Sequence, residues 1–109
     1  MSVESAHAVP NAARGEASVR VGGADLILRP SFAALCAAEK ELGSLFELVE
    51  RAVAAKLHLH EIVALFWHCC VERPEELTRE ALGEAMTATG LAKLTPDLRV
   101  LLGQILQGR

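Results

Sequence analysis

The sequence predicts a mainly helical α+β fold, in which an N-terminal β-hairpin precedes a small bundle of about five helices. Two short runs of alternating apolar residues near the start are joined by a Gly-Gly pair, which is the pattern of a hairpin. After Pro30, apolar residues recur at helical spacing between capping signals. Tyr is absent and aromatic residues make up 4% of the chain, and this composition favours helices over strands.

The 109 residues suffice for one domain. Residues 1–14 show no periodicity, so we expect a mobile leader before a domain that spans 15–109. The hairpin is predicted over 16–29, with Ile27 on its polar side. Its apolar side consists of Ala17, Val19, Val21, Leu26 and Leu28. An isolated hairpin is only marginally stable in water, so this apolar side must pack against the helices.

Capping signals divide the remainder into five predicted helices, at about 31–42, 44–56, 59–72, 78–89 and 95–107. Ser31 is placed to cap the first helix and Gly43 to end it. The second helix begins with Ser44 and Glu47, which have the S-x-x-E spacing of a capping box.

Later signals set the other helix ends and one surface ion pair. Glu47 and Arg51 are spaced i, i+4, which predicts an ion pair on the outside of the second helix. Pro74 is expected to end the third helix just before it. Thr95 and Pro96 have the pattern of an N-cap followed by the first helical residue, and they predict the start of the fifth helix.

Composition excludes several classes of function. The net charge is −3, and the basic residues are scattered singly, whereas a nucleic-acid-binding protein usually has a basic face. The apolar runs fall far short of the roughly 20 residues that span a bilayer, and the N-terminus lacks the features of a secretory signal. Three cysteines without a framework spacing indicate reduced thiols. We therefore expect a cytoplasmic protein with no nucleic-acid or membrane partner.

The segment Trp67-His68-Cys69-Cys70 contains residue types that occur in metal and thiol sites. On a helix these residues diverge, at about 100° per residue: Cys70 faces the core, Cys69 and Trp67 lie at its flanks, and His68 points to solvent. Spacings such as C-x-x-C are absent, so we predict no metal, no cofactor and no enzyme activity, and we expect Cys36, Cys69 and Cys70 to be buried as small apolar side chains. The alternative is a thiol or metal-binding protein that uses the Cys69-Cys70 region, and a Cys–His pair formed across helices stays open.

Three residues are candidates for binding a partner. Glu39 falls in the middle of the predicted apolar face of the first helix, where an unpaired charge is costly. It either caps a backbone end or pairs with an Arg inside the fold, or it belongs to a partner-binding surface. Leu65 at the edge of the polar face of the third helix and Trp67 at its flank are the other candidates. The apolar face around Glu39 consists of Phe32, Leu35, Cys36 and Leu42.

Several short motifs resemble a known family. They are a Gly-Glu opening, a Gly-Gly turn, an "L-x-x-x-E-x-x-L-G" pattern with its capping motif, "HLHEIVALF" at 58–66 and "LTREAL" at 77–82. The first three correspond to Gly15-Glu16, Gly22-Gly23, Leu35, Glu39, Leu42 and Gly43. With these motifs the chain is similar, from about residue 15 to 106, to the small tail protein of gene transfer agents and related prophages. That family is described as a tail tube protein and is also treated as a tail assembly chaperone.

The resemblance implies a non-enzymatic role in building a phage-type tail. The expected function is that of a tail assembly chaperone that binds the tape measure protein, and a structural tail tube component is the alternative. The family implies no catalytic residue. Its implied partners are the tape measure or another tail protein, with a homo-oligomer as a further possibility, and its location is the cytoplasm or the virion. His58, in place of a Ser-type N-cap, and the Trp67–Cys70 cluster depart from the family pattern.

Overall fold

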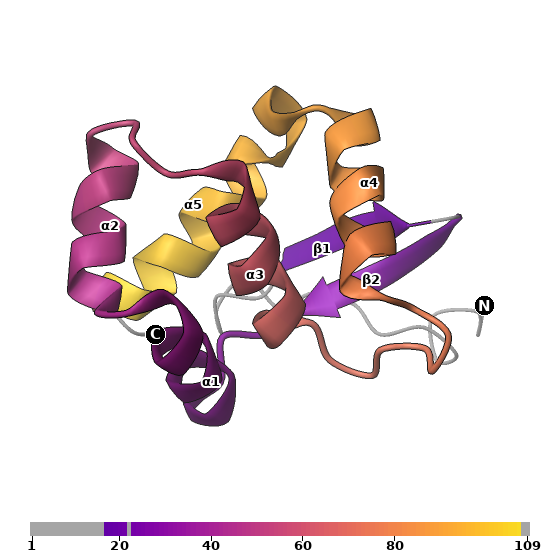
Figure 1. Cartoon of the computed structure of the whole chain (residues 1–109), viewed down its shortest axis with the longest axis horizontal. Helices are drawn as coiled ribbons and strands as arrows, with labels where there is room; N and C mark the ends of the chain where they lie inside the picture. The colour runs from indigo at the N-terminus through magenta and orange to yellow at the C-terminus, as the bar shows by residue number, and fades with distance from the viewer. Residues whose placement is uncertain (1–16, 22, 108–109) are drawn as a thin grey trace.

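A computed structural model of the chain describes residues 17–21 and 23–107, and it confirms the predicted fold class. An antiparallel hairpin is followed by five helices (Figure 1). The elements are β1 (Ala17–Val21), β2 (Ala24–Leu28), α1 (Phe32–Leu42), α2 (Leu45–Val53), α3 (Leu59–Cys69), α4 (Arg79–Thr89) and α5 (Leu91–Gln107). The predicted leader 1–14 lies outside the described residues.

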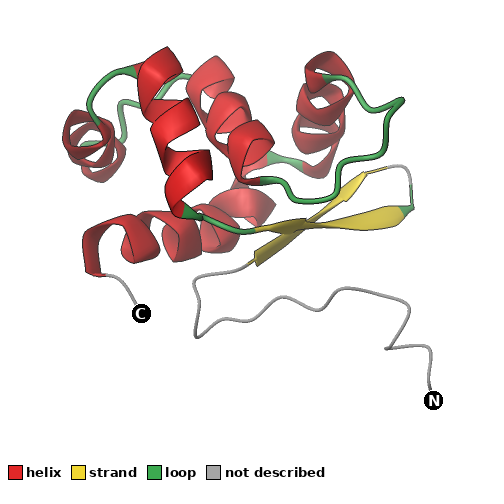
Figure 2. Ribbon diagram, turned by 90° about the horizontal axis from the view of Figure 1, so that it is seen from below, coloured by secondary structure: helices red, strands yellow, loops and turns green. Residues whose placement is uncertain are grey.

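The predicted hairpin is confirmed, and it packs against the helices. Ala17 pairs with Leu28 and Val21 with Ala24. α4 and α5 contact β1, and Figure 2 shows the helices lying on one face of the hairpin. The buried apolar residues of that face join the main core, as expected for a hairpin that is marginal by itself. Ile27 is also buried, although the alternation placed it on the polar side.

Helix α3 lies in the middle of the molecule and packs against α1 and α4 (Figure 1). Its buried side chains point in all directions around the helix: Glu61, Val63, Ala64, Leu65, Phe66 and Cys69. A helical wheel of this segment groups Leu59 with the apolar side and Ala64 with the polar side, and the structure contradicts both. Ala64 is buried, and Leu59 is 44% exposed. A helix enclosed by its neighbours loses the one-sided pattern from which a sector can be predicted.

Helix α3 ends three residues earlier than predicted, because its end pairs with β2. The Arg29 amide donates to the Cys69 carbonyl at 2.7 Å, and the Val71 amide donates to the Ile27 carbonyl at 3.0 Å. Cys70 is thus extended and forms a bridge with Leu28. It is buried as expected, but it is not part of the helix.

The fifth helix begins at Leu91 and not at residue 95 as predicted. Gly90 ends α4 at a φ of 98°, and α5 starts with the next residue. Thr95 lies inside α5, where its hydroxyl donates to the Leu91 carbonyl at 3.0 Å and caps no helix end. Pro96 also lies inside the helix. The local Thr-Pro pattern is common at helix starts, but here the position of Gly90 determines the start.

The two predicted serine caps are confirmed, and Thr78 caps the start of α4 in the same way. Ser31 accepts from the Ala34 amide, Ser44 from the Glu47 amide, and Thr78 from the Ala81 amide. Each side chain satisfies one backbone donor that has no partner within the helix.

Arg51 does not form its main ion pair with Glu47 as predicted, but with Glu61 on α3. The guanidinium donates to Glu61 Oε1 at 2.7 Å, and the His58 amide donates to the same oxygen at 2.8 Å. These two hydrogen bonds, that from Arg51 first, lower the pKa of the Glu61 carboxyl from 4.5 to about 2. Glu61 is the buried charged residue of the described chain, so the pair ties α2 to the start of the central helix.

We expect Glu61→Gln to destabilise the fold by roughly 2 kcal/mol at neutral pH, because Arg51 loses its charged partner. The folded carboxylate binds a proton less readily than the unfolded one, so its contribution is complete above about pH 4.5 and is lost as the pH falls towards about 2. Urea unfolding of both proteins over this pH range measures the difference, with the exposed Glu50→Gln as control. Equal unfolding midpoints at neutral pH would contradict the assignment.

Candidate functional site

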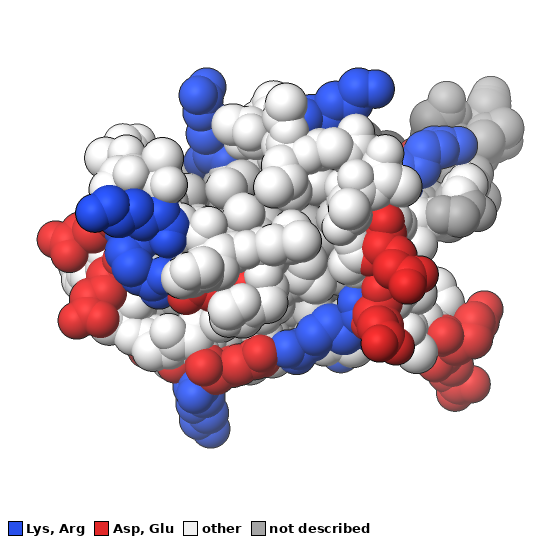
Figure 3. Space-filling model, turned by 45° about the horizontal axis from the view of Figure 1, so that its top comes forward, with Lys and Arg blue, Asp and Glu red and all other residues white. Residues whose placement is uncertain are grey.

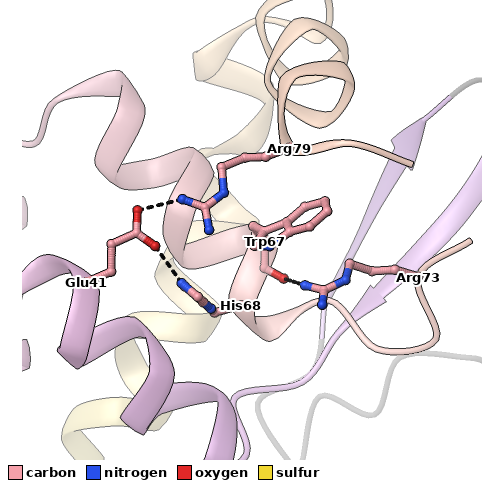
Figure 4. Close-up of polar contacts among 5 residues, drawn as sticks. All are labelled: Glu41, Trp67, His68, Arg73 and Arg79. Carbon is pink, nitrogen blue, oxygen red and sulfur yellow. Dashed lines mark hydrogen bonds and ion pairs between the residues drawn. The ribbon is translucent and has the colours of Figure 1, made fainter. Parts of the chain in front are cut away.

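Trp67 is held between two arginines that follow it in the sequence (Figure 4). The Arg73 guanidinium lies 4.1 Å from the centre of the indole ring, and that of Arg79 lies 5.7 Å from it. Arg73 also donates to the Trp67 carbonyl at 2.7 Å, near the end of α3. The ring is half-buried, at the flank of the helix as predicted. The arginines contact it by cation–π attraction, and its role as a partner contact stays a prediction.

Glu41 of α1 contacts one side chain on α3 and one on α4, so it connects three helices (Figure 4). From α1 its carboxylate accepts from Arg79 of α4 at 2.5 Å, and its other oxygen lies 2.7 Å from Nε2 of His68 on α3. Arg79 first, and then His68, lower the pKa of the Glu41 carboxyl. The expectation that His68 is a solvated surface residue is therefore wrong, since its side chain is mostly buried and paired with Glu41 of α1.

Cys69 and Cys70 are buried, as predicted, and burial favours the neutral thiol form of each side chain over the charged thiolate. Burial raises the pKa of the Cys69 thiol to about 12 and also raises that of Cys70. Because the thiolate is the form that attacks electrophiles or binds metals, these positions are unsuited to the thiol or metal alternative. Within residues 17–21 and 23–107, no group of three or more His, Cys, Asp or Glu side chains is placed to hold a metal ion.

Leu65 was predicted at the edge of the polar face of the third helix, and this placement is wrong. The residue is 0% exposed and belongs to the main core. It is buried because α3 is enclosed on several sides and its nominal polar face is covered. Leu65 therefore offers no surface to a partner in this structure.

Only part of the predicted apolar face of α1 faces the core, since Leu35 and Leu42 are half-buried and pack against it. The buried residue of this helix is Ala38, while Phe32 is 85% exposed and Cys36 is half-buried, against the prediction for both. The exposed side chains border a surface groove of about 280 Å³, which we call the α1–α2 groove. Its lining residues come from α1, the start of α2 and α5: Phe32, Leu35, Cys36, Glu39, Leu45, Phe46 and Ile105. Phe46 is 78% exposed, so two phenylalanines border the groove without being covered.

Glu39 is exposed and lies at the α1–α2 groove rather than in the core. Its Oε2 accepts from the Leu45 amide at 3.2 Å, at the first residue of α2. A carboxylate there also faces the positive end of the helix dipole. The first of the two sequence hypotheses, a cap on a backbone end, agrees with this contact. Direct participation of Glu39 in partner binding stays a prediction.

A second groove, of about 390 Å³, runs between α2 and α5. Val53 and Leu106 line it and are both exposed. Leu106 follows Ile105, which lines the α1–α2 groove, so consecutive residues of α5 border the two depressions. The surface formed by α1, α2 and α5 thus carries several large apolar side chains. Patches of this kind mark sites of protein interaction more often than isolated exposed residues do.

The sequence of residues 14–108 matches a family described as "Phage tail tube protein, GTA-gp10". The chain belongs to this tail protein family. The resemblance to tail proteins of gene transfer agents is thereby confirmed over nearly the whole chain. No curated protein and no solved structure matches it.

Membership in this family indicates a structural role in a phage-type tail, and it points to other tail proteins as partners. None of the helices in the described part of the chain is long and apolar enough to cross a membrane.

Burial predicts the order in which the thiols of this tail protein react. Cys36 should be modified first by a thiol reagent under native conditions, because it is half-buried beside a groove, whereas Cys69 and Cys70 are buried and protonated. Thiol titration of the native and the urea-unfolded protein measures this, with Cys36→Ser as control. Fast native modification of Cys69 in that variant would revive the thiol alternative.

Proposed function

We propose that this protein is a tail assembly chaperone that binds an apolar helical segment of the tape measure protein in the α1–α2 groove. The observation that carries the proposal is the pair of exposed phenylalanines, Phe32 and Phe46, on a member of a phage tail family. An amphipathic helix that lays its apolar face into such a groove is a common mode of peptide recognition.

The energetics favour an apolar partner. Covering one phenylalanine side chain is worth about 1.5–3 kcal/mol, so two exposed rings offer a substantial driving force for association. The groove also contains Leu35 and Leu45, which are half-buried and would be covered with the rings. A tape measure protein that is long and prone to aggregate would in turn be kept soluble by a charged chaperone surface.

A structural tail tube component is the second candidate, and the description of the family fits it about as well. A tube built by β-pairing between subunits needs strands with free edges. The described residues hold one two-stranded sheet with five residues in each strand, and α4 and α5 pack on β1. This limited strand content favours the chaperone. The chaperone would act in the cytoplasm during assembly, whereas the tube component would remain in the virion.

Co-expression with the tape measure protein encoded nearby tests the proposal. We expect the wild-type chain to increase the soluble yield of that protein and to co-purify with it. Phe32→Ser/Phe46→Ser should abolish both effects and leave the melting temperature nearly unchanged, since both rings are exposed. Leu91→Ser is the matched control, because Leu91 is exposed but lines none of the grooves described.

The content of purified particles separates the two candidates. A chaperone should be absent or present in few copies, and a tube component should be present in many. Abundant chain in the particles, with no soluble complex on co-expression, would replace the chaperone by the tube component.

Glu39→Gln distinguishes the cap from a partner contact. We expect a loss of roughly 0.5 kcal/mol in the free energy of unfolding, because the charge at the start of α2 is removed, and no change in affinity for the partner. Urea unfolding and binding to the tape measure protein measure the two quantities, with Glu50→Gln as control. Weaker binding at unchanged stability would assign Glu39 to the interface.

A further inference from the structure

We infer that a separate groove between α3 and α4 is a second docking site, and that it binds an amphipathic helix carrying two basic residues at i, i+4 spacing. This α3–α4 groove has a volume of about 1040 Å³ and is the largest of the three. It shares no lining residue with the α1–α2 groove, so the inference goes beyond the proposed function.

The floor of the α3–α4 groove is apolar. Leu59 and Val63 of α3 face Gly83 and Ala88 of α4 across it. The Thr87 hydroxyl donates to the Gly83 carbonyl at 2.8 Å, so this polar group is already satisfied. An apolar helix face can therefore cover the floor without leaving the Thr87 donor unpaired.

The charges around the groove are unbalanced. Glu80 and Glu84 are one helical turn apart on α4, and neither forms an ion pair within the described residues. At one end, Glu41 and Arg79 neutralise each other. Figure 3 shows a face with uncharged atoms across its middle and a row of acidic side chains along one side. The complement of two unpaired carboxylates one turn apart is two Lys or Arg residues with the same spacing.

The length of the groove suits a helix. The 11 residues of α4 extend about 16 Å, which corresponds to three turns of a helix lying alongside. A second copy of this chain is a poor occupant, because no two of its 11 Lys and Arg residues are three or four positions apart. The occupant inferred is therefore a different protein with a basic, amphipathic helix.

Two synthetic helical peptides of roughly 16 residues test the inference, both with one leucine stripe. One has lysines at i, i+4 beside the stripe, and the other has glutamates there. We expect the full chain to bind the lysine peptide in fluorescence anisotropy, with an affinity that falls as salt is added, and to bind the glutamate peptide at least tenfold more weakly.

Variants of the chain locate the site. Glu80→Gln/Glu84→Gln should weaken lysine-peptide binding by roughly fivefold and Glu80→Lys/Glu84→Lys by more than tenfold, whereas Glu75→Lys/Glu76→Lys, with the same change in charge outside the groove, should not. Ala88→Gln obstructs the floor and should also weaken binding. Ala81→Gln, at an exposed position of α4 outside the lining, is its control.

Four outcomes would overturn the inference. Three are equal binding of the two peptides, an equal loss with Glu75→Lys/Glu76→Lys, and a dimer in sedimentation that Glu80→Gln/Glu84→Gln dissociates. The fourth is a loss of lysine-peptide binding with Phe46→Ser, which we expect to leave it unchanged, because that loss would assign the peptide to the α1–α2 groove. Circular dichroism melting of each variant separates lost binding from lost folding.

Discussion

The enclosure of α3 is the constraint on which the other elements depend. Because this helix buries side chains all around its axis, its neighbours must cover several of its faces at once. α1 and α4 cover two of them, and β2 is joined to its end by backbone hydrogen bonds around Cys69. Polar side chains near both ends of α3 then need partners from neighbouring helices. Arg51 of α2 pairs with Glu61 near the start, and Glu41 of α1 pairs with His68 near the end.

This central position also explains the exposed apolar surface. α1 turns its small residue Ala38 toward the core, where a close approach of two helices leaves little room for larger side chains. Phe32 lies about 120° around the helix from Ala38 and is then directed outward. Leu35 lies between them, where it both packs against the core and lines the α1–α2 groove. The apolar surface around this groove is thus a product of how the core is packed, and it borders the contact that stabilises the fold.

Local signals predicted much of the fold. The serine caps and the hairpin depend on residues a few positions apart, and they are as expected. The end of α3 depends on a hydrogen bond between Arg29 and Cys69, which are distant in sequence, so the helix pattern could not predict it. The prediction that Leu65 lies at the edge of a polar face was wrong for the same reason, because the burial of a helix on all sides depends on its tertiary contacts.

The candidate site was predicted in part. Glu39 is a carboxylate among apolar residues in the sequence, and its place at the groove beside exposed Phe32 explains that pattern without a buried charge. The exposure of Phe32 was missed, because a periodic apolar stripe is the same whether it faces the core or a partner.

The single residue Gly90 between α4 and α5 has a mechanical consequence. With one residue as the link, the angle between the two helices is set by one pair of backbone torsions instead of by a loop with slack. Its positive φ is a conformation that glycine adopts at little cost and that other residues resist. The junction therefore fixes the angle between α4 and α5, and with it the orientation of the surface on α4 relative to the surfaces on α5.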